Sequence, residues 1–259
     1  MAQARNPHGR RLFVQSLISL LTATPPGQMR KRVNWLTRII RDLKNKVTLT
    51  LYFLRHGQTE MSRANKFCGS GLDPDLTADG RQMAQSFAED YREKPWQAIY
   101  TSSLRRTIAT AKPLCDALGI TSHICADLNE IGYGEWEGLT KEEVDAAYHD
   151  DDIRWLADPA WHAPTGGELA VEIARRGLRV LEEIEQQNID GNVLVVAHKA
   201  TIRILLCSLL GIDVGRFRYR LACPVGSLSV VEFSLAGPLL QSLADRAHLS
   251  EALRSLPGT

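Results

Sequence analysis

The chain has 259 residues, 44% of them hydrophobic and 24% charged, which allows one sizeable buried core with a short appendage but not a second full domain. Its five cysteines show no CxxC or finger-like spacing, which argues against a disulfide framework and a structural zinc site. No apolar run approaches the roughly 18 residues of a membrane span, so no transmembrane segment is expected.

Residues 1–46 form a strongly basic N-terminal extension. They contain ten Lys or Arg and one acid, Asp42, so their net charge is +9, whereas the remainder of the chain carries −8. Apolar residues at helical spacing between Val33 and Leu43 predict a basic amphipathic helix, within a segment that is otherwise expected to be partly disordered. The alternatives are an arm for an acidic partner or surface, and an organelle-targeting segment. The domain itself is expected to span 47–259.

From residue 47 onward, short apolar strands alternate with helix-length amphipathic segments. This alternation predicts an α/β fold, a three-layer sandwich in which a mainly parallel central sheet is flanked by helices on both faces. The expected elements, in chain order, are a strand at 47–54, a helix at 77–94, a strand at 97–102, a helix from 104 that ends at Gly119, a helix at 168–187, a strand at 192–198, a helix that ends at Gly211, and a strand at 227–233. The tail after Gly237 is expected to be helical or frayed.

Two histidines directly follow apolar strands. His56 comes after "LYFLR" and His198 after "NVLVVA", so in a parallel sheet both imidazoles emerge at the same edge. Arg55 precedes the first histidine, and Arg106 lies just inside the N-terminus of a helix that follows another strand. A lone histidine at a strand end is more often a hydrogen-bonded structural residue, but two histidines and two arginines together suit a phosphate. Gly57 is expected to let the backbone turn closely past the anion.

A metal site is the other functional interpretation of these histidines, since imidazole is a common zinc ligand. Arg55 argues against it, because a guanidinium beside a dication is unfavourable, whereas beside a phosphate it is a bidentate partner. We therefore expect no metal and no other cofactor.

Several segments together resemble the histidine phosphatase superfamily, which includes cofactor-dependent phosphoglycerate mutases, fructose-2,6-bisphosphatase and broad-specificity or α-ribazole phosphatases. "LRHGQTE" is similar to its signature, and the phosphatase branches fit better than the mutases. Four further segments match in the same order: "YTSSLRRTIATA", "LNEIGYGEWEGLT", "PTGGE" and "VLVVAHKATIR". The resemblance implies Arg106 as a phosphate-binding residue, Glu130 as the acid/base carboxylate and His198 as the second histidine.

The mechanism implied by the resemblance is metal-independent hydrolysis of a small phosphorylated metabolite through a phosphohistidine intermediate. His56 attacks phosphorus, while Arg55, Arg106 and His198 hold the phosphoryl oxygens. A protonated Glu130 supplies the proton to the leaving group and later takes one from water.

The chain departs from the family pattern around the first motif and after the second histidine. Ser62 stands where the family commonly has a phosphate-binding asparagine, and its hydroxyl can donate one hydrogen bond. Lys66 and Cys68 replace an arginine and a glutamine, so all three positions are candidates for substrate selection. Lys199 replaces a glycine, and two alternatives stay open: it points into solvent, or it reaches the site as an additional cation. Cys68 is expected to be an inert thiol rather than a redox-active one.

Two other functions compete with hydrolysis. One is a phosphoglycerate mutase-like phosphotransferase or sugar bisphosphatase. The other is a slow or inactive scaffold that binds phosphorylated ligands, which the unusual Ser62 and Lys199 motivate.

Partners and location are less constrained by the sequence. Nucleic-acid binding is not expected, because the body carries −8 and no basic patch with interleaved aromatic residues stands out. A homodimer is an open option. Cysteine usage favours a reducing compartment, so the cytoplasm is expected unless the basic extension directs the chain to an organelle.

Overall fold

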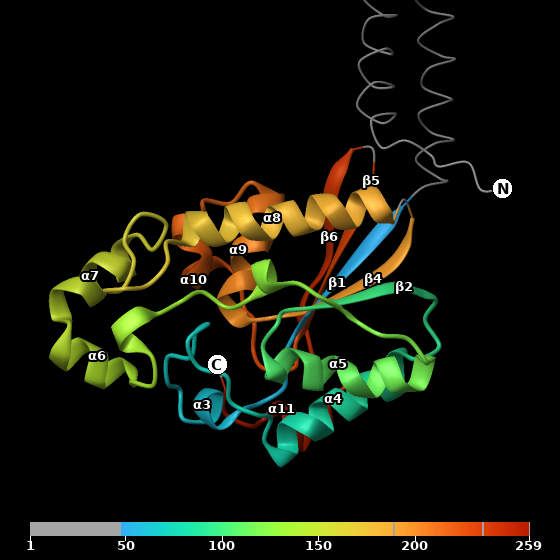
Figure 1. Cartoon of the computed structure of the whole chain (residues 1–259), viewed down its shortest axis with the longest axis horizontal. Coiled ribbons are helices and arrows are strands. Elements are labelled where there is room, and N and C mark those ends of the chain that lie inside the picture. Colours follow the sequence, from blue (N-terminus) through green and yellow to red (C-terminus); the bar gives the residue numbers. More distant parts are fainter. Residues whose placement is uncertain (1–47, 189, 235, 259) are drawn as a thin grey trace, which may run out of the picture. The chain divides into compact units, whose positions relative to one another are not determined.

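A six-stranded mixed sheet with the order β3-β2-β4-β1-β5-β6 lies at the centre of the fold (Figure 1). The computed structural model describes residues 48–258 except 189 and 235. The expectations for the 1–46 extension, including the helix between Val33 and Leu43, therefore lie outside the described residues. The strands are β1 (Leu49–Arg55), β2 (Trp96–Thr101), β3 (His123–Ile124), β4 (Gly191–Ala197), β5 (Leu228–Ser234) and β6 (Gly237–Asp245).

Helices cover both faces of this sheet, as the α/β three-layer prediction requires (Figure 1). The α-helices are α3 (Glu60–Arg63), α4 (Ala78–Tyr91), α5 (Arg105–Leu118), α6 (Lys141–Ala147), α7 (His149–Ala157), α8 (Ala170–Gln187), α9 (Lys199–Leu210), α10 (Phe217–Arg220) and α11 (Glu251–Arg254). Short 3₁₀ turns lie at Ala126–Leu128, Gly134–Trp136 and Val214–Arg216.

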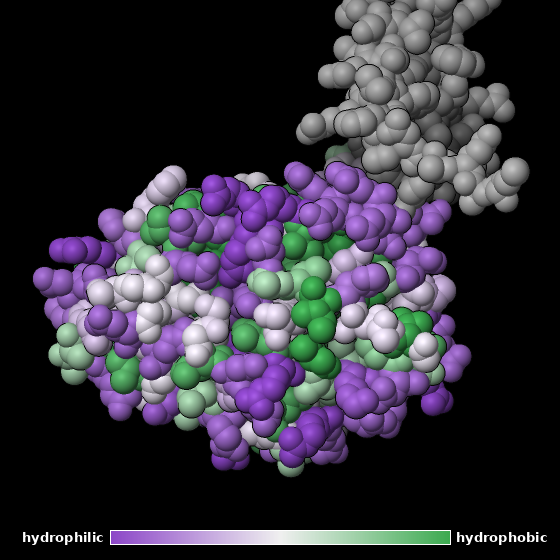
Figure 2. All heavy atoms as spheres, viewed as in Figure 1, coloured by the Kyte–Doolittle hydropathy of each residue, from purple (hydrophilic) through white to green (hydrophobic). Residues whose placement is uncertain are grey.

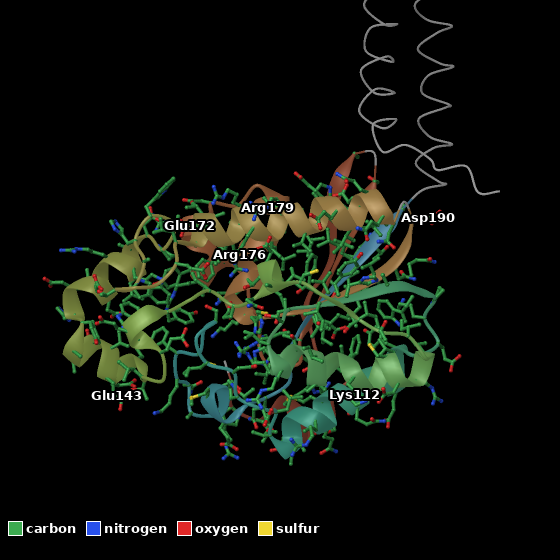
Figure 3. The ribbon with its side chains drawn as sticks, in the orientation of Figure 1. Lys112, Glu143, Glu172, Arg176, Arg179 and Asp190 are labelled. Atoms are coloured by element: carbon green, nitrogen blue, oxygen red, sulfur yellow. The ribbon has the colours of Figure 1, made fainter. Side chains whose placement is uncertain are left out.

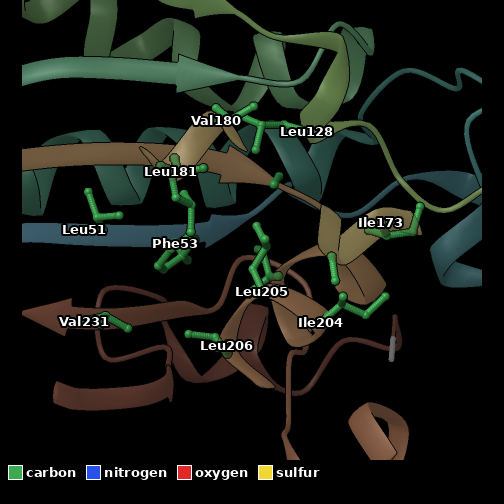
Figure 4. Close-up of a cluster of buried hydrophobic side chains, with 14 of the residues drawn as sticks. Leu51, Phe53, Leu128, Ile173, Val180, Leu181, Ile204, Leu205, Leu206 and Val231 are labelled. Atoms are coloured by element: carbon green, nitrogen blue, oxygen red, sulfur yellow. The ribbon is translucent and has the colours of Figure 1, made fainter. Parts of the chain in front are cut away.

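Alternating side chains of β1 fill two separate cores. Leu51 and Phe53 point to one face and pack with Leu205 of α9 and its neighbours on α8 (Figure 4). Leu54 points to the other face and packs with Phe87 of α4. Because strand side chains alternate between faces, a strand buried on both sides must be apolar throughout, which is the pattern of β1 and β4.

The central pair of strands sets the position of the site. β1 and β4 run parallel, with Arg55 opposite Ala197 in the register. His56 and His198 are the next residues along each strand, so both leave the sheet at the same edge. This juxtaposition confirms the sequence expectation for the two histidines.

Two parts of the sheet differ from a purely parallel arrangement. β5 pairs antiparallel with β1, and β6 pairs antiparallel with β5. The prediction of a helical or frayed tail after Gly237 was therefore wrong for Gly237–Asp245, although the short helix α11 follows at Glu251–Arg254. β6 is an edge strand whose side chains are all exposed or half-buried, so its backbone ladder leaves little hydrophobic pattern in the sequence.

The helical hairpin α6–α7 was not anticipated, although its start carries a recognisable signal. Thr140 accepts a hydrogen bond from the backbone N–H of Glu143, and the Glu143 carboxylate accepts one from the N–H of Thr140. This reciprocal pair is the capping box that the letters T-x-x-E indicate. The hairpin forms one wall of the cavity described below.

The surface seen in Figure 2 is mainly hydrophilic, with small apolar groups scattered between the charged ones. Within the described part of the chain, no helix combines the length and the apolarity needed to cross a bilayer.

Candidate active site

His56 is buried at the end of β1 with one ring nitrogen fixed by the backbone. Its Nδ1 lies 2.8 Å from the carbonyl oxygen of Gly57. Because a carbonyl only accepts, Nδ1 carries the proton and Nε2 keeps its lone pair. Burial, together with the nearby Arg106 and Arg55 guanidiniums, holds the pKa of His56 well below its usual value. The residue is therefore a neutral imidazole with an unprotonated Nε2.

Gly57 is required by packing, whereas the close approach to an anion expected from the sequence stays a prediction. A Cβ there would lie 2.3 Å from the carbonyl oxygen of Gly80, in the first turn of α4. The neighbouring backbone is therefore a helix turn pressed against the end of β1. The Gly57 N–H donates to the Thr110 hydroxyl of α5 at 3.0 Å.

Arg106 and His198 form a buried pair beneath His56. The Nε of Arg106 donates to Nδ1 of His198 at 3.3 Å, so Nε2 of this histidine carries the proton and donates to the Ser102 hydroxyl at 2.8 Å. His198 is 0% exposed, and its ring centroid lies 5.2 Å from that of His56. Burial and then the Arg106 charge hold its pKa well below the ordinary value. Both ring nitrogens are thus engaged in this arrangement.

The other two nitrogens of Arg106 are held by the loop before α4. Nη1 donates to the carbonyl of Leu72 at 2.8 Å, and Nη2 donates to that of Gly69 at 3.0 Å. Asp73 lies 3.6 Å from Nη1. These contacts fix the guanidinium at the first turn of α5, where the sequence placed it.

Glu130 is 4% exposed and is held at the N-terminus of α9. Its Oε1 accepts from the N–H of Ile131 and from both the N–H and the hydroxyl of Thr201, while Oε2 accepts, among the described residues, only from the N–H of Ala200. Oε2 therefore keeps a free lone pair, and Glu130 lines the cavity. Arg176, which is labelled on α8 in Figure 3, supports this segment by donating to the carbonyls of Asp127 and Asn129.

Arg55 is 4% exposed and is oriented by the last described residues of the chain. Its Nη1 donates to the carbonyls of Cys223 at 2.7 Å and of Gly258 at 3.0 Å. The side-chain amide of Gln58 donates to the carbonyl of Pro257 at 2.7 Å. Two residues that flank His56 are therefore held by the same short tail segment, a contact that no local sequence pattern indicated.

A cavity of about 440 Å³ opens over these groups and is strongly basic. Its charged lining comprises seven Lys or Arg side chains and one carboxylate: Arg55, Lys66, Arg106, Lys141, Lys199, Arg203, Arg218 and Glu130. Its outer walls are aromatic, formed by Phe67, Tyr133, Trp155, Phe217 and Tyr219. The cavity has the volume of a small-molecule site. His198 lies behind this lining rather than in it.

The remaining predicted residues have distinct positions. Ser62 lines the cavity, but its hydroxyl donates to the carbonyl of Thr59 in the capping box of α3, so a bond to phosphate would require it to rotate. Lys66 and Cys68 line the cavity as well. Burial raises the pKa of the Cys68 thiol to about 11, which agrees with an inert thiol. Lys199 also lines the cavity, and its role as an additional cation for the substrate stays a prediction.

Arg203, Arg218 and their aromatic neighbours were missed by the sequence reasoning. The letters "RFRYR" at 216–220 are a basic run with interleaved aromatics, so the statement that none stands out was wrong. Arg203 was also foreseeable, because it follows Lys199 by four positions on one helix and so shares its face.

A neutral buried imidazole with a free nitrogen, flanked by guanidiniums at the carboxyl edge of an α/β sheet, is the arrangement of an enzyme that transfers a phosphoryl group. Comparison with known proteins agrees. Residues 51–246 match the model of the histidine phosphatase superfamily (branch 1).

The matched relatives are named as phosphatases. Over 201 residues the chain is 30% identical to phosphoserine phosphatase 1 of Hydrogenobacter thermophilus, which covers 78% of this chain and 94% of the relative. Over 171 residues it is 38% identical to a glucosyl-3-phosphoglycerate phosphatase of Mycolicibacterium vanbaalenii. That match covers 63% of this chain and 75% of the relative. A solved structure of a mycobacterial glucosyl-3-phosphoglycerate phosphatase is 27% identical, has a TM-score of 0.70, and covers 77% of this chain and 100% of its own.

The chain therefore belongs to the histidine phosphatase superfamily and is a phosphoric monoester hydrolase of that type. The family and the phosphatase branch expected from the motifs are confirmed. Homodimer formation, contact of the basic extension with an acidic partner and a cytoplasmic location stay predictions.

The tail contact with Arg55 predicts that deleting residues 257–259 impairs catalysis. Arg55 loses the Gly258 carbonyl and Gln58 loses that of Pro257, so the guanidinium keeps the Cys223 carbonyl but is less tightly oriented. We expect kcat/KM for p-nitrophenyl phosphate to fall roughly tenfold or more, the usual scale of a charged hydrogen bond. The surface substitution Arg254→Ala, which keeps both carbonyls, is the matched control. Full activity after the deletion would contradict a positioning role for the tail.

The buried histidines predict that the fold loses stability in acid. His248 is 8% exposed and packs edge-on against Phe87 and Tyr91. Burial lowers its pKa, although the carboxylates of Asp245 and Asp90 oppose the shift. Its folded-state pKa lies below the unfolded value of about 6.5, so below that pH the unfolded chain binds the proton first. The free energy of unfolding therefore falls as pH drops, as it does for His56 and His198.

The substitution His248→Phe removes one of these contributions without touching the site. Urea unfolding at pH 7, 6 and 5 is expected to show a smaller loss of stability than in the wild type, by up to about 1.4 kcal/mol per pH unit for one proton. The exposed His162, changed to Ala, serves as control and leaves the slope unchanged. Identical slopes for His248→Phe and the wild type would exclude the effect.

Proposed function

We propose that this chain hydrolyses a small phosphorylated metabolite without a metal ion, through a phosphohistidine formed on Nε2 of His56. The observation that carries the proposal is the free Nε2, which the Gly57 carbonyl leaves unprotonated between the charges of Arg55 and Arg106. A cavity of about 440 Å³ suits a small molecule rather than a polymer.

In the first step, the lone pair of Nε2 forms a bond to phosphorus as the bond from phosphorus to the ester oxygen breaks. Arg55 and Arg106 stabilise the charge on the phosphoryl oxygens. Since Arg106 already donates to His198, this histidine reaches the phosphoryl group only when Nδ1 is released and protonated. A bound phosphate dianion favours that protonation, because it offsets the positive charges that lower the pKa of His198.

Glu130 is the proposed proton carrier. Oε1 accepts from three donors and Oε2 from one among the described residues, so we assign the transferred proton to Oε2 of this cavity-lining side chain. The proton passes to the leaving oxygen, and the carboxylate then removes a proton from the water that attacks the phosphohistidine. The second step releases phosphate and restores both His56 and the protonated Glu130.

The relatives support a small substrate with a phosphate monoester. By their names, they act on phosphoserine and on glucosyl-3-phosphoglycerate. Each of these molecules carries a carboxylate in addition to its phosphate monoester. Phosphotransfer between two substrate positions and slow binding without turnover are the competing outcomes that the assay below distinguishes.

The test is phosphate release from p-nitrophenyl phosphate and a panel of metabolite phosphates, each with and without EDTA. The wild type is expected to turn over in EDTA, and His56→Ala to lose at least about a thousandfold in kcat because it lacks the nucleophile. His162→Ala, an exposed histidine, is the matched control.

Three results would count against the proposal. Activity that requires Mg²⁺ or survives His56→Ala would overturn the mechanism. Isomerisation of 3-phosphoglycerate without phosphate release would indicate a mutase. Tight phosphate binding with no turnover on any substrate would indicate a scaffold.

A further inference from the structure

The cavity holds more positive charge than a phosphoryl group needs. Seven Lys or Arg side chains line it against one carboxylate, Glu130. Arg55 and Arg106 adjoin His56 and account for the phosphoryl site. Lys141 is neutralised by an ion pair with the buried Asp152 of α7. Of the four remaining cations, Lys66 lies in the loop after α3, whereas Lys199 and Arg203 lie on α9 and Arg218 lies on α10.

Arg203 has a structural role in the wall of the cavity formed by α9 and α10. Its Nε donates to the carbonyl of Leu221 and its Nη2 to the carbonyl of Arg218. These bonds tie α9 to α10 and fix the backbone of Arg218. Arg203 is therefore a brace for this wall, although it adds to the positive potential.

Arg218 offers an unused guanidinium. It stacks on the Trp155 ring, with its central carbon 3.8 Å from the ring centroid. Among the described residues, no carboxylate or carbonyl accepts a hydrogen bond from its side chain. A stacked guanidinium keeps its N–H edges free, and those edges match the two oxygens of a carboxylate or phosphate.

Lys199 is the second unused cation. It is the first residue of α9, directly after His198, and it lines the cavity. Within the part of the chain that the structure describes, its ammonium has neither a carboxylate partner nor a hydrogen-bond acceptor. Burial, and then the charges of Arg55, Arg203 and Arg218, lower the pKa of Lys199 to about 7, while Cys223 opposes them. A cation placed among cations is costly, and such a site is relieved by a bound anion.

We infer that Lys199 and Arg218 form a second anion subsite, so that the preferred substrates are phosphomonoesters with a further acidic group a few bonds from the phosphate. This inference rests on the proposed function. The second group is a carboxylate or another phosphate, since both present oxygens to an ammonium and a guanidinium. The aromatic walls of Trp155 and Tyr219 lie at the subsite and cover the substrate's carbon chain.

Matched substrate pairs test the subsite. The carboxylate arm compares 3-phosphoglycerate with glycerol 3-phosphate, and the phosphate arm compares fructose 1,6-bisphosphate with fructose 6-phosphate. p-Nitrophenyl phosphate reports the chemistry without a second anion. At pH 6.5, we expect the wild type to favour the more anionic member of at least one pair by roughly tenfold or more in kcat/KM. The arm that shows the preference identifies the second group.

The substitution Lys199→Gln is expected to remove that preference and to leave p-nitrophenyl phosphate hydrolysis within about twofold of the wild type. Arg218→Gln should act in the same direction. Lys112→Gln, an exposed lysine on α5 paired with Asp116 (Figure 3), is the matched control and should change neither.

The pH dependence supplies an independent readout. Since the pKa of Lys199 lies near 7 in the free enzyme, its charge is present below pH 7 and lost above it. The preference for the anionic substrate should therefore decline between pH 6 and pH 8.5, because kcat/KM reports the free enzyme. Lys199→Arg should keep the preference and flatten its pH profile.

The possible failures are distinguishable. If the wild type hydrolyses p-nitrophenyl phosphate but treats both members of each pair equally, the subsite does not exist while the proposed function stands. Equal losses of kcat/KM on all substrates in Lys199→Gln would likewise overturn the proposed subsite. If the wild type hydrolyses none of the phosphates, the proposed function itself fails.

Discussion

The site depends on guanidiniums that are held mainly by main-chain carbonyls. Arg55 donates to the carbonyls of Cys223 and Gly258, and Arg203 donates to those of Arg218 and Leu221. Among the described residues, neither has a carboxylate within ion-pair distance. A carbonyl dipole fixes the direction of a guanidinium but leaves its full charge uncompensated. The cavity is thus electrostatically incomplete until an anion enters. Burial, and then the charges of Arg106 and Arg55, hold the pKa of His56 low and keep the imidazole neutral.

The fold supplies those carbonyls from segments far apart in the sequence. The parallel pairing of β1 and β4 brings His56 and His198 to one edge. The loop at Gly69 and Leu72 then closes on Arg106, and the last described residues close on Arg55. Catalytic geometry here is a property of tertiary packing, so changes well outside the motif are expected to affect it.

The difference between local sequence patterns and tertiary contacts explains what the sequence could and could not predict. Strands buried on both faces and amphipathic helices have strong periodic patterns, and both histidines were foreseen from their positions after such strands. Contacts between segments far apart in the sequence depend on tertiary position and leave no local sequence signal, so the tail contact and the engagement of both His198 nitrogens by Arg106 and Ser102 were not foreseen. The strand β6 was not predicted, because an edge strand with no buried side chain lacks an alternating hydrophobic pattern. Arg218, in contrast, lay in a visible basic and aromatic run that was overlooked.

The central claim is that Nε2 of His56 becomes covalently phosphorylated. Rapid quenching of the enzyme with a phosphomonoester substrate, followed by peptide mapping under alkaline conditions, measures this directly, since phosphohistidine is stable in alkali and labile in acid. The account predicts a phosphate on the peptide that contains His56, formed before steady-state release and absent in His56→Ala. Phosphate release with no phosphoenzyme at any quench time, or a phosphate on another residue, would contradict it.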